Sequence, residues 1–171
     1  MERLFIGFSS PINFKIGAEA IKWWTNSLYS HCYLRFEYKN SKTAIFHAAH
    51  GMVHFRSETN FFRENKSIKE YEIQLTDQSH SELFDECMDL AGENYGKVEL
   101  IKIFLSDIIY SMARKEIPWE NSSGYICSEL VGKLCIDRLG LSFSKPTYLL
   151  KPFDIDSKLK EFYQVTSPEL T

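Results

Sequence analysis

The sequence predicts an α+β fold in which a small antiparallel sheet packs against helices. Two observations favour this class. Strand-like alternation of apolar and polar residues dominates the first half of the chain, and apolar residues at helical spacing dominate the second half. The 171 residues suit one domain, and no Pro-, Gly- or Ser-rich linker divides them. We therefore expect a single domain over residues 1–171.

The expected strands are short segments in the first half of the chain. In order, they are residues 4–8, 30–38, 43–48, 52–56 and 71–75. The segment 30–38 has the clearest period of two. Its apolar face carries Cys32, Leu34, Phe36 and Tyr38, and its other face carries His31, Tyr33, Arg35 and Glu37. Residues 60–69 match no such pattern, and we expect a loop on the substrate side there.

The expected helices cover residues 16–24, 79–91, 98–113, 127–139 and 154–162. Ser79 is expected to cap the second of these helices, because Glu82 three residues later completes a capping box. Gly140 is expected to end the fourth helix, since glycine readily adopts the left-handed conformation that follows a helix.

Residues 98–113 form the most apolar segment of the chain. Charged residues at Glu99, Lys102 and Asp107 interrupt it. Its uncharged stretches are therefore far shorter than the roughly 20 residues that a membrane-spanning helix needs. We expect no membrane span but a buried helix, with a homodimer contact through this segment as a further possibility.

Composition and charge narrow the function classes. The net charge of -3 and the pI of about 6.0 argue against a nucleic-acid partner, whose binders need a basic face. No secretory signal precedes the first apolar run, so we expect a cytoplasmic protein, including a viral protein in host cytoplasm. The four cysteines form no CxxC pair, and free thiols are expected.

Cys127 is the cysteine whose surroundings favour catalysis. The loop at 121–124 leads into the helix expected at 127–139, which puts the thiol in the first helical turn, near the positive end of the helix dipole. Such a position lowers the ordinary thiol pKa of about 8.5, and the thiolate is the nucleophile. Backbone N–H groups there could also hold an oxyanion. The other three cysteines lie on apolar faces and are expected to be structural.

Histidines of the predicted strands could serve the thiol. His31 begins one strand, and His47 lies on the next, where its ring could orient that of His31. A zinc site from His47, His50 and His54, with His31 or Cys127, is the alternative. The spacing of these histidines spans a glycine-containing bend and fixes no ligand geometry, so we expect no metal. His80 is expected to face solvent in a capping turn.

Several motifs occur in a characteristic order along nearly the whole chain. They are TNSLYSHCYL at 25–34, IFHA at 45–48, AGENYG at 91–96, YICSELV at 125–131 and LLKPFDI at 149–155. This set resembles the circularly permuted branch of the papain-like NlpC/P60 superfamily, in particular its YiiX-like group. The histidine motif before the cysteine motif is the order of the permuted branch.

The resemblance implies a permuted papain-like fold and a cysteine hydrolase without a cofactor. Cys127 would be the nucleophile, His31 the base and His47 the orienting group. The substrate would be a peptide, isopeptide or acyl compound, cleaved at an amide or ester through a thioester. Tyr125 is a candidate for the oxyanion hole. Glu129 is a secondary candidate with an expected structural role, because it points about 200° around the helix from Cys127.

Three alternatives to an amidase or peptidase remain open. A lipid ester hydrolase or acyltransferase would suit the apolar segment at 98–113, although the chain lacks the Asn-Cys-Glu-His motif of the lecithin:retinol acyltransferase-like relatives. A structural or virion protein could retain the site for limited processing. A non-enzymatic binding module on the same scaffold is less compatible with the joint presence of the three site residues.

Overall fold

A sheet of antiparallel strands forms the centre of the protein. The computed structural model describes residues 3–39, 42–94, 124–163 and 165–166. The strands follow the order β4-β3-β2-β1-β5-β6, and each is antiparallel to its neighbours. They are β1 (Arg3–Pro11), β2 (His31–Glu37), β3 (Thr43–Ala49), β4 (Met52–Ser57), β5 (Asn65–Ile73) and β6 (Val165–Thr166). The prediction of an α+β fold with an antiparallel sheet is confirmed.

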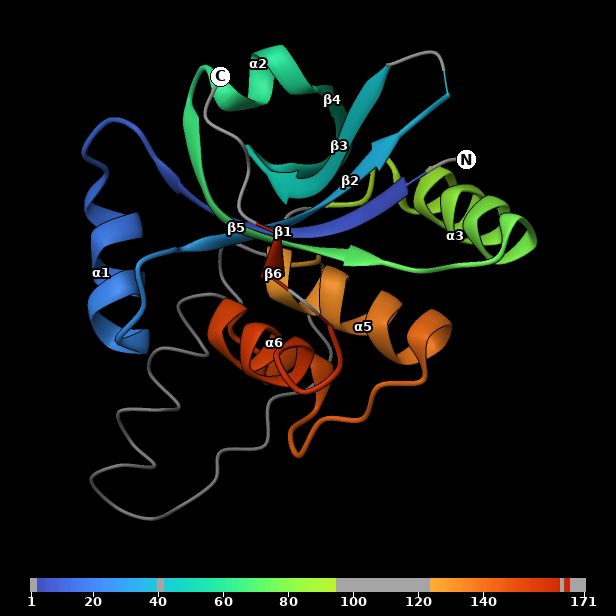
Figure 1. Cartoon of the computed structure of the whole chain (residues 1–171). Helices are drawn as coiled ribbons and strands as arrows, with labels where there is room; N and C mark the ends of the chain where they lie inside the picture. Colours follow the sequence, from blue (N-terminus) through green and yellow to red (C-terminus); the bar gives the residue numbers. More distant parts are fainter. Residues whose placement is uncertain (1–2, 40–41, 95–123, 164, 167–171) are drawn as a thin grey trace.

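Helices cover the sheet unequally (Figure 1). They are α1 (Ile16–Thr25), α2 (Glu58–Phe62), α3 (Asp77–Leu90), α5 (Cys127–Leu139), the short 3-10 helix η1 (Thr147–Leu149) and α6 (Pro152–Leu159). In Figure 1, α5 and α6 lie below the sheet, α2 lies above it, and α3 lies at its right-hand side. The expected helix at 98–113, with its possible homodimer contact, lies outside the described residues.

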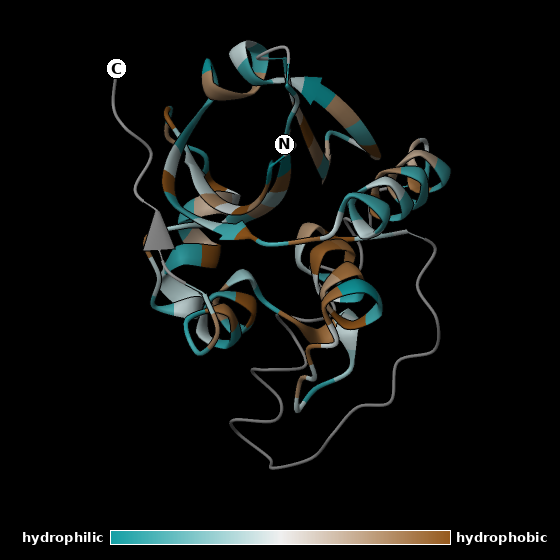
Figure 2. Ribbon diagram, turned by 45° about the vertical axis from the view of Figure 1, so that its right-hand side comes forward, coloured by the Kyte–Doolittle hydropathy of each residue, from teal (hydrophilic) through white to brown (hydrophobic). Residues whose placement is uncertain are grey.

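The main core lies between the sheet and α5. Leu34 and Phe36 of β2 pack there against Leu130 and Leu134 of α5, and all four side chains are buried. Figure 2 shows the hydrophobic residues gathered where the strands and this helix face one another. A smaller cluster of Tyr33, Ile45 and Phe61 fills the opposite face under α2. Strand β2 is therefore buried on both faces, and its second face is not the polar, open face that simple alternation predicts.

Strand β5 is longer than expected, and no loop occupies residues 60–69. Its sequence is too polar to show a strand pattern, but the strand forms because its buried charged residue, Glu70, has partners. Glu70 is 2% exposed and accepts two hydrogen bonds from the Arg35 guanidinium, at 2.6 and 3.0 Å, and one from the Tyr33 hydroxyl, at 2.8 Å. Buried carboxylates need such partners. The sequence pattern does not show them, because Arg35 and Tyr33 lie on another strand.

Helix α3 begins two residues before the predicted start. Thr76, not Ser79, is its N-cap, and the Thr76 hydroxyl accepts a hydrogen bond from the Ser79 N–H at 3.2 Å. The shift moves His80 into the helix, where the ring is buried edge-on against Phe36, with centroids 5.5 Å apart. The prediction that His80 faces solvent is wrong. Gly140 ends α5 in the left-handed conformation, with φ 64°, as predicted.

Helix α6 is fixed to the sheet by a buried carboxylate. Asp156 is 1% exposed and accepts hydrogen bonds from the hydroxyls of Tyr29 (2.6 Å) and Tyr71 (2.5 Å) and from Lys69 Nζ (2.8 Å). Burial opposes ionisation of this carboxyl, but the hydrogen bonds from Lys69, Tyr29 and Tyr71 outweigh it and lower the pKa of Asp156. The cluster holds α6, which follows Lys151, against the sheet.

None of the helices in the described part of the chain combines the length and the apolar character needed to cross a bilayer.

Candidate active site

Cys127 is the first residue of α5, and its side chain is 8% exposed. The segment before it approaches the backbone at Asn94 closely: the Tyr125 N–H donates to the Asn94 carbonyl at 2.8 Å, and a Cβ at Gly124 would lie 2.5 Å from the same oxygen. The N-cap residue is Ile126, whose side chain has no hydrogen-bonding atom. The first-turn N–H groups of α5 are therefore not capped by that side chain.

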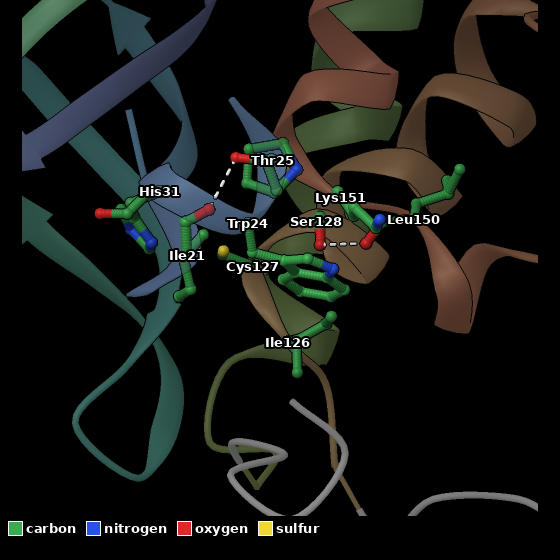
Figure 3. A pocket seen from close by; sticks show the side chains of 11 residues that line it. Ile21, Trp24, Thr25, His31, Ile126, Cys127, Ser128, Leu150 and Lys151 are labelled. Carbon is green, nitrogen blue, oxygen red and sulfur yellow. Dashed lines mark hydrogen bonds between the residues drawn. The ribbon is translucent and has the colours of Figure 1, made fainter. Parts of the chain in front are cut away.

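The start of α5 lies against the start of β2, close to two side chains of that strand. His31 and Cys32 are its first two residues, and both hydrogen-bond the Cys127 sulfur. Figure 3 shows the Cys127 side chain and the His31 ring facing one another across the pocket. Alternation along the strand assigns His31 and Cys32 to opposite faces of the sheet. At the first two positions of β2, however, both side chains contact the Cys127 sulfur.

These contacts make the Cys127 thiol unusually acidic. Hydrogen bonds from the Cys32 thiol and from His31, together with the charge of His31, outweigh the opposing effect of burial and hold the pKa of Cys127 well below its ordinary value. Burial raises the pKa of Cys32 well above the ordinary value, so this thiol stays protonated and donates. Cys127 is the member of the pair that carries the negative charge.

His47 contacts the far side of the His31 ring. His31 Nε2 and His47 Nδ1 lie 3.0 Å apart, with the rings edge-on at 81°. This contact leaves His31 Nδ1 to face Cys127. Burial, followed by the charges of His31 and His54, lowers the pKa of His47 to about 2, so this ring is neutral at physiological pH. A neutral His47 with an unprotonated Nδ1 accepts the Nε2–H of a protonated His31 and holds that ring in position.

Two further contacts hold the His47 ring itself. It packs edge-on with the Phe61 ring, with centroids 5.1 Å apart, and its centroid lies 4.6 Å from that of the tilted His54 ring. His47 is 1% exposed, and its Nε2 has no hydrogen-bond partner among the described residues. A buried polar atom without a partner costs stability, and such costs concentrate at functional sites.

A pocket of about 40 Å³ opens at Cys127 and His31 (Figure 3). Its walls are mostly apolar, and they come from α1, the start of α5, and the segment that joins η1 to α6. The lining residues are Ile21, Trp24, Thr25, Ser30, His31, Ile126, Cys127, Ser128, Leu150, Lys151 and Pro152. The Ser128 hydroxyl is not free for chemistry, because it donates to the Leu150 carbonyl at 2.5 Å.

The predicted site residues divide into two groups. The structure brings Cys127, His31 and His47 together, although three different elements carry them. Tyr125 and Glu129 are not among the residues that line the pocket: Tyr125 packs against the main core, and Glu129 lies in the first turn of α5.

The sequence patterns do not single out Cys32 or Lys151 as residues of the site. Alternation along β2 assigns Cys32 to the core face, and no local signal distinguishes it from an ordinary buried thiol. Lys151 precedes α6 and reaches the pocket through a contact of its Nζ with the Trp24 ring of α1, which no sequence pattern indicates. In the described part of the chain, no group of three or more His, Cys, Asp or Glu side chains is arranged to hold a metal ion.

Comparison with known proteins assigns no family to the chain. No protein-family model matches the sequence, and no curated protein is significantly similar to it.

Proposed function

We propose that this protein is a cysteine hydrolase of the amidase or peptidase type, with Cys127 as nucleophile, His31 as general base and His47 as the residue that orients His31. The observation that carries the proposal is an acidic thiol at a helix start, hydrogen-bonded to a histidine in a pocket. The proposal includes the permuted papain-like arrangement that the sequence motifs resemble, since the base here precedes the nucleophile in the chain.

The proposed reaction begins with the Cys127–His31 ion pair. The thiolate attacks the carbonyl carbon of an amide or ester, the C–S bond forms, and the carbonyl oxygen takes the negative charge. The Cys127 N–H, in the first turn of α5, is in position to donate to that oxyanion. His31 then gives its proton to the leaving nitrogen or oxygen, which yields a thioester.

Hydrolysis of the thioester returns the enzyme to its starting state. His31, now neutral, takes a proton from water, the hydroxide attacks the thioester carbonyl, and the Cys127 thiolate leaves. His47 keeps Nδ1 of His31 directed at the sulfur through both steps. The apolar walls of the pocket keep bulk water away from the ion pair, which strengthens the attraction between the two charges.

The direct test uses p-nitrophenyl acetate as a generic activated ester. We expect a burst of p-nitrophenol from the wild type, and an acetyl group on Cys127 when the acidified protein is mapped by mass spectrometry. Cys127→Ala should show neither. Cys135→Ala is the matched control, because Cys135 lies two turns along the same helix and burial raises its pKa to about 12. Acetylation of another residue, with an unchanged burst in Cys127→Ala, would refute the proposal.

A lipid ester is the second candidate substrate, and one feature near the pocket favours it. Helix α1, which contributes Ile21 and Trp24 to the pocket, has no buried residue, and Trp23 on it is 81% exposed. Phe14 and Ile16 before and at its start are also largely exposed. Exposed apolar patches of this kind mark binding surfaces. Faster turnover of an ester presented in phospholipid vesicles than of the same ester in solution would favour a lipid substrate over a peptide.

A further inference from the structure

Two of the four cysteines contact one another at the candidate site. Cys127 is the first residue of α5, Cys32 is the second residue of β2, and both belong to the main core. The side chain and the backbone of Cys32 both hydrogen-bond the Cys127 sulfur. The fold therefore holds two free thiols in direct contact, although they are far apart in the sequence.

The two thiols differ in their access to the pocket. Cys127 is 8% exposed and lines the pocket, and Figure 3 shows its sulfur beside the side chains of the pocket wall. Cys32 is fully buried and is not among the lining residues. A small reagent that enters the pocket therefore reaches the sulfur of Cys127 and not that of Cys32.

The two thiols also differ in acidity. The hydrogen bonds from Cys32 and His31 lower the pKa of Cys127, whereas burial raises the pKa of Cys32. Peroxides oxidise a thiolate far more readily than a thiol. An accessible thiolate beside a second thiol is the arrangement typical of cysteines that are oxidised reversibly, because the second thiol resolves the oxidised form as a disulfide.

We propose that Cys127 is a site of reversible oxidation by hydroperoxides, with Cys32 as the resolving thiol that forms a Cys32–Cys127 disulfide. The site goes beyond the proposed function, since it depends on the contact and the acidity of the thiols and not on cleavage of an amide or ester. Where Cys127 also acts as the nucleophile, the disulfide blocks it and reduction restores it.

The proposed oxidation takes two steps and consumes one peroxide molecule. In the first step the Cys127 thiolate attacks one oxygen of hydrogen peroxide, the O–O bond breaks, and the departing hydroxide takes a proton from protonated His31. The product is the sulfenic acid of Cys127 and water. In the second step the Cys32 sulfur attacks the Cys127 sulfur, the S–O bond breaks, and the departing hydroxide leaves as water with the Cys32 proton. The two sulfurs lose two electrons and the peroxide gains them.

The first step prepares Cys32 for the second. The hydrogen bond with Cys127 and the negative charge of Cys127 are two of the causes that raise the pKa of Cys32. A sulfenic acid is neutral, so its formation removes the contribution of that charge. The pKa of Cys32 then falls, which favours the thiolate form that attacks sulfur.

Cys135 and Cys87 supply matched controls. Cys135 lies two turns along α5, about 12 Å from Cys127 along the helix axis. A disulfide requires Cα atoms within about 7 Å, so these two residues of one helix cannot pair. Cys87 lies on α3, and burial is the largest cause that raises the pKa of both thiols.

The experiment maps the cysteines of the reduced protein after treatment with hydrogen peroxide. The reaction is stopped with acid, free thiols are blocked with N-ethylmaleimide in denaturant, and the peptides are analysed by mass spectrometry with and without prior reduction by dithiothreitol. In the wild type we expect a Cys32–Cys127 disulfide that dithiothreitol returns to two thiols.

Removal of the resolving thiol should make the oxidation irreversible. Cys32→Ser keeps a hydroxyl donor toward Cys127, and we expect a sulfenic acid that dimedone traps, followed by sulfinic acid. The fraction of Cys127 that dithiothreitol recovers should fall at least about fivefold relative to the wild type. Cys32→Ala should repeat this loss, whereas Cys135→Ala and Cys87→Ala should form the same disulfide as the wild type.

The disulfide map of the wild type tests the inference even if a Cys32 variant does not fold. Direct conversion of Cys127 to sulfinic acid in the wild type would overturn the inference, and so would a disulfide that joins Cys32 to Cys135 or one that joins two chains. A Cys127 that stays reduced in excess peroxide would overturn it as well.

The p-nitrophenyl acetate burst separates this inference from the proposed function. A burst from the reduced protein without a Cys32–Cys127 disulfide after oxidation leaves the nucleophile in place and removes the resolving role of Cys32. The disulfide without a burst supports the oxidation site and contradicts the hydrolase. If both proposals hold, peroxide should abolish the burst and dithiothreitol should restore it.

Discussion

Two buried polar clusters lie on either side of the start of β2, and they differ in how completely their groups are paired. In one, both oxygens of Asp156 accept hydrogen bonds, from Lys69 and two tyrosines. The other cluster contains Cys127, Cys32, His31 and His47. Its hydrogen bonds join Cys127 to Cys32 and His31, and His31 to His47, while His47 Nε2 has no partner among the described residues. Tyr29 belongs to the first cluster, and His31, two residues later, belongs to the second.

The difference shows what each cluster does. Around Asp156, opposite charges and full hydrogen bonding favour one arrangement, so the cluster stabilises the docking of α6. Around Cys127, hydrogen bonds from Cys32 and His31 stabilise the thiolate, and His31 is also the proposed proton carrier. The His47 ring that orients His31 remains neutral, and its Nε2 has no partner among the described residues. Burial alone does not produce this chemistry, because Cys135 is also buried on the same helix and has a raised pKa.

The largest effect is expected at the fully paired cluster. Asp156→Ala removes the buried carboxylate that accepts hydrogen bonds from Lys69 and two tyrosine hydroxyls, and we expect a loss of about 3–5 kcal/mol in the free energy of unfolding. Urea denaturation measures it. Lys160→Ala is the control, because Lys160 is half exposed and lies 3.4 Å from the same carboxylate, and the expected loss is below about 1 kcal/mol. Equal losses in both variants would contradict a special role for the buried contacts.

The pKa of Asp156 also gives a pH dependence. Because its pKa is lower in the folded state than in the unfolded chain, its ionised form stabilises the fold above the unfolded value, about 3.9. That stabilisation is lost as the pH falls through the lower folded pKa. Acid unfolding followed by circular dichroism should therefore show a stability loss below about pH 4 in the wild type that is reduced in Asp156→Asn. Identical acid profiles would show that this carboxyl does not drive the loss.

The second largest effect is expected at the base of the reactive cluster. His31→Ala removes a charge and a hydrogen bond that lower the pKa of Cys127. We expect the alkylation rate at pH 7 to fall about 10- to 100-fold, with the pH profile displaced to higher pH. His54→Ala, whose ring contacts His47 but not the thiol, should leave the rate within about threefold of the wild type. An unchanged profile in His31→Ala would remove His31 from the site.

A smaller effect is expected at His47, which acts on the thiol through His31. His47→Ala should lower turnover of p-nitrophenyl acetate about tenfold, because the His31 ring loses the acceptor that orients it. His47→Asn keeps an acceptor oxygen and should recover part of the activity. If Asn and Ala behave alike while both variants keep the stability of the wild type, an orienting role for His47 is wrong.

The smallest effect is expected at Cys32, since a neutral thiol is a weak donor. Cys32→Ala should raise the pKa of Cys127 and slow alkylation at pH 7 about three- to fivefold. Cys32→Ser restores a hydroxyl donor and should bring the profile back toward that of the wild type. A pKa that is the same in all three proteins would contradict the contact between the two thiols.

Much of the fold could be predicted from local patterns, and the exceptions have a common cause. The strands that alternate strictly and the helix that ends at Gly140 were predictable, because their signals lie within the elements themselves. Strand β5 and the start of α3 were not: one depends on Glu70 being neutralised by Arg35, and the other on which of two hydroxyls, Thr76 or Ser79, caps the helix. The first is decided by a contact between strands that are far apart in the sequence, and the second by a small difference in free energy between two possible caps.

The candidate site follows the same division. The sequence by itself determined a cysteine at a helix start, a histidine at a strand start and an α+β chain, because residue type and periodicity are local properties. Only the tertiary structure decided that Cys32 donates to Cys127, that His47 is neutral and buried, and that Lys151 lies over Trp24 at the pocket. The physical reason is that pKa values and pocket charges depend on distances between residues that are far apart in the chain.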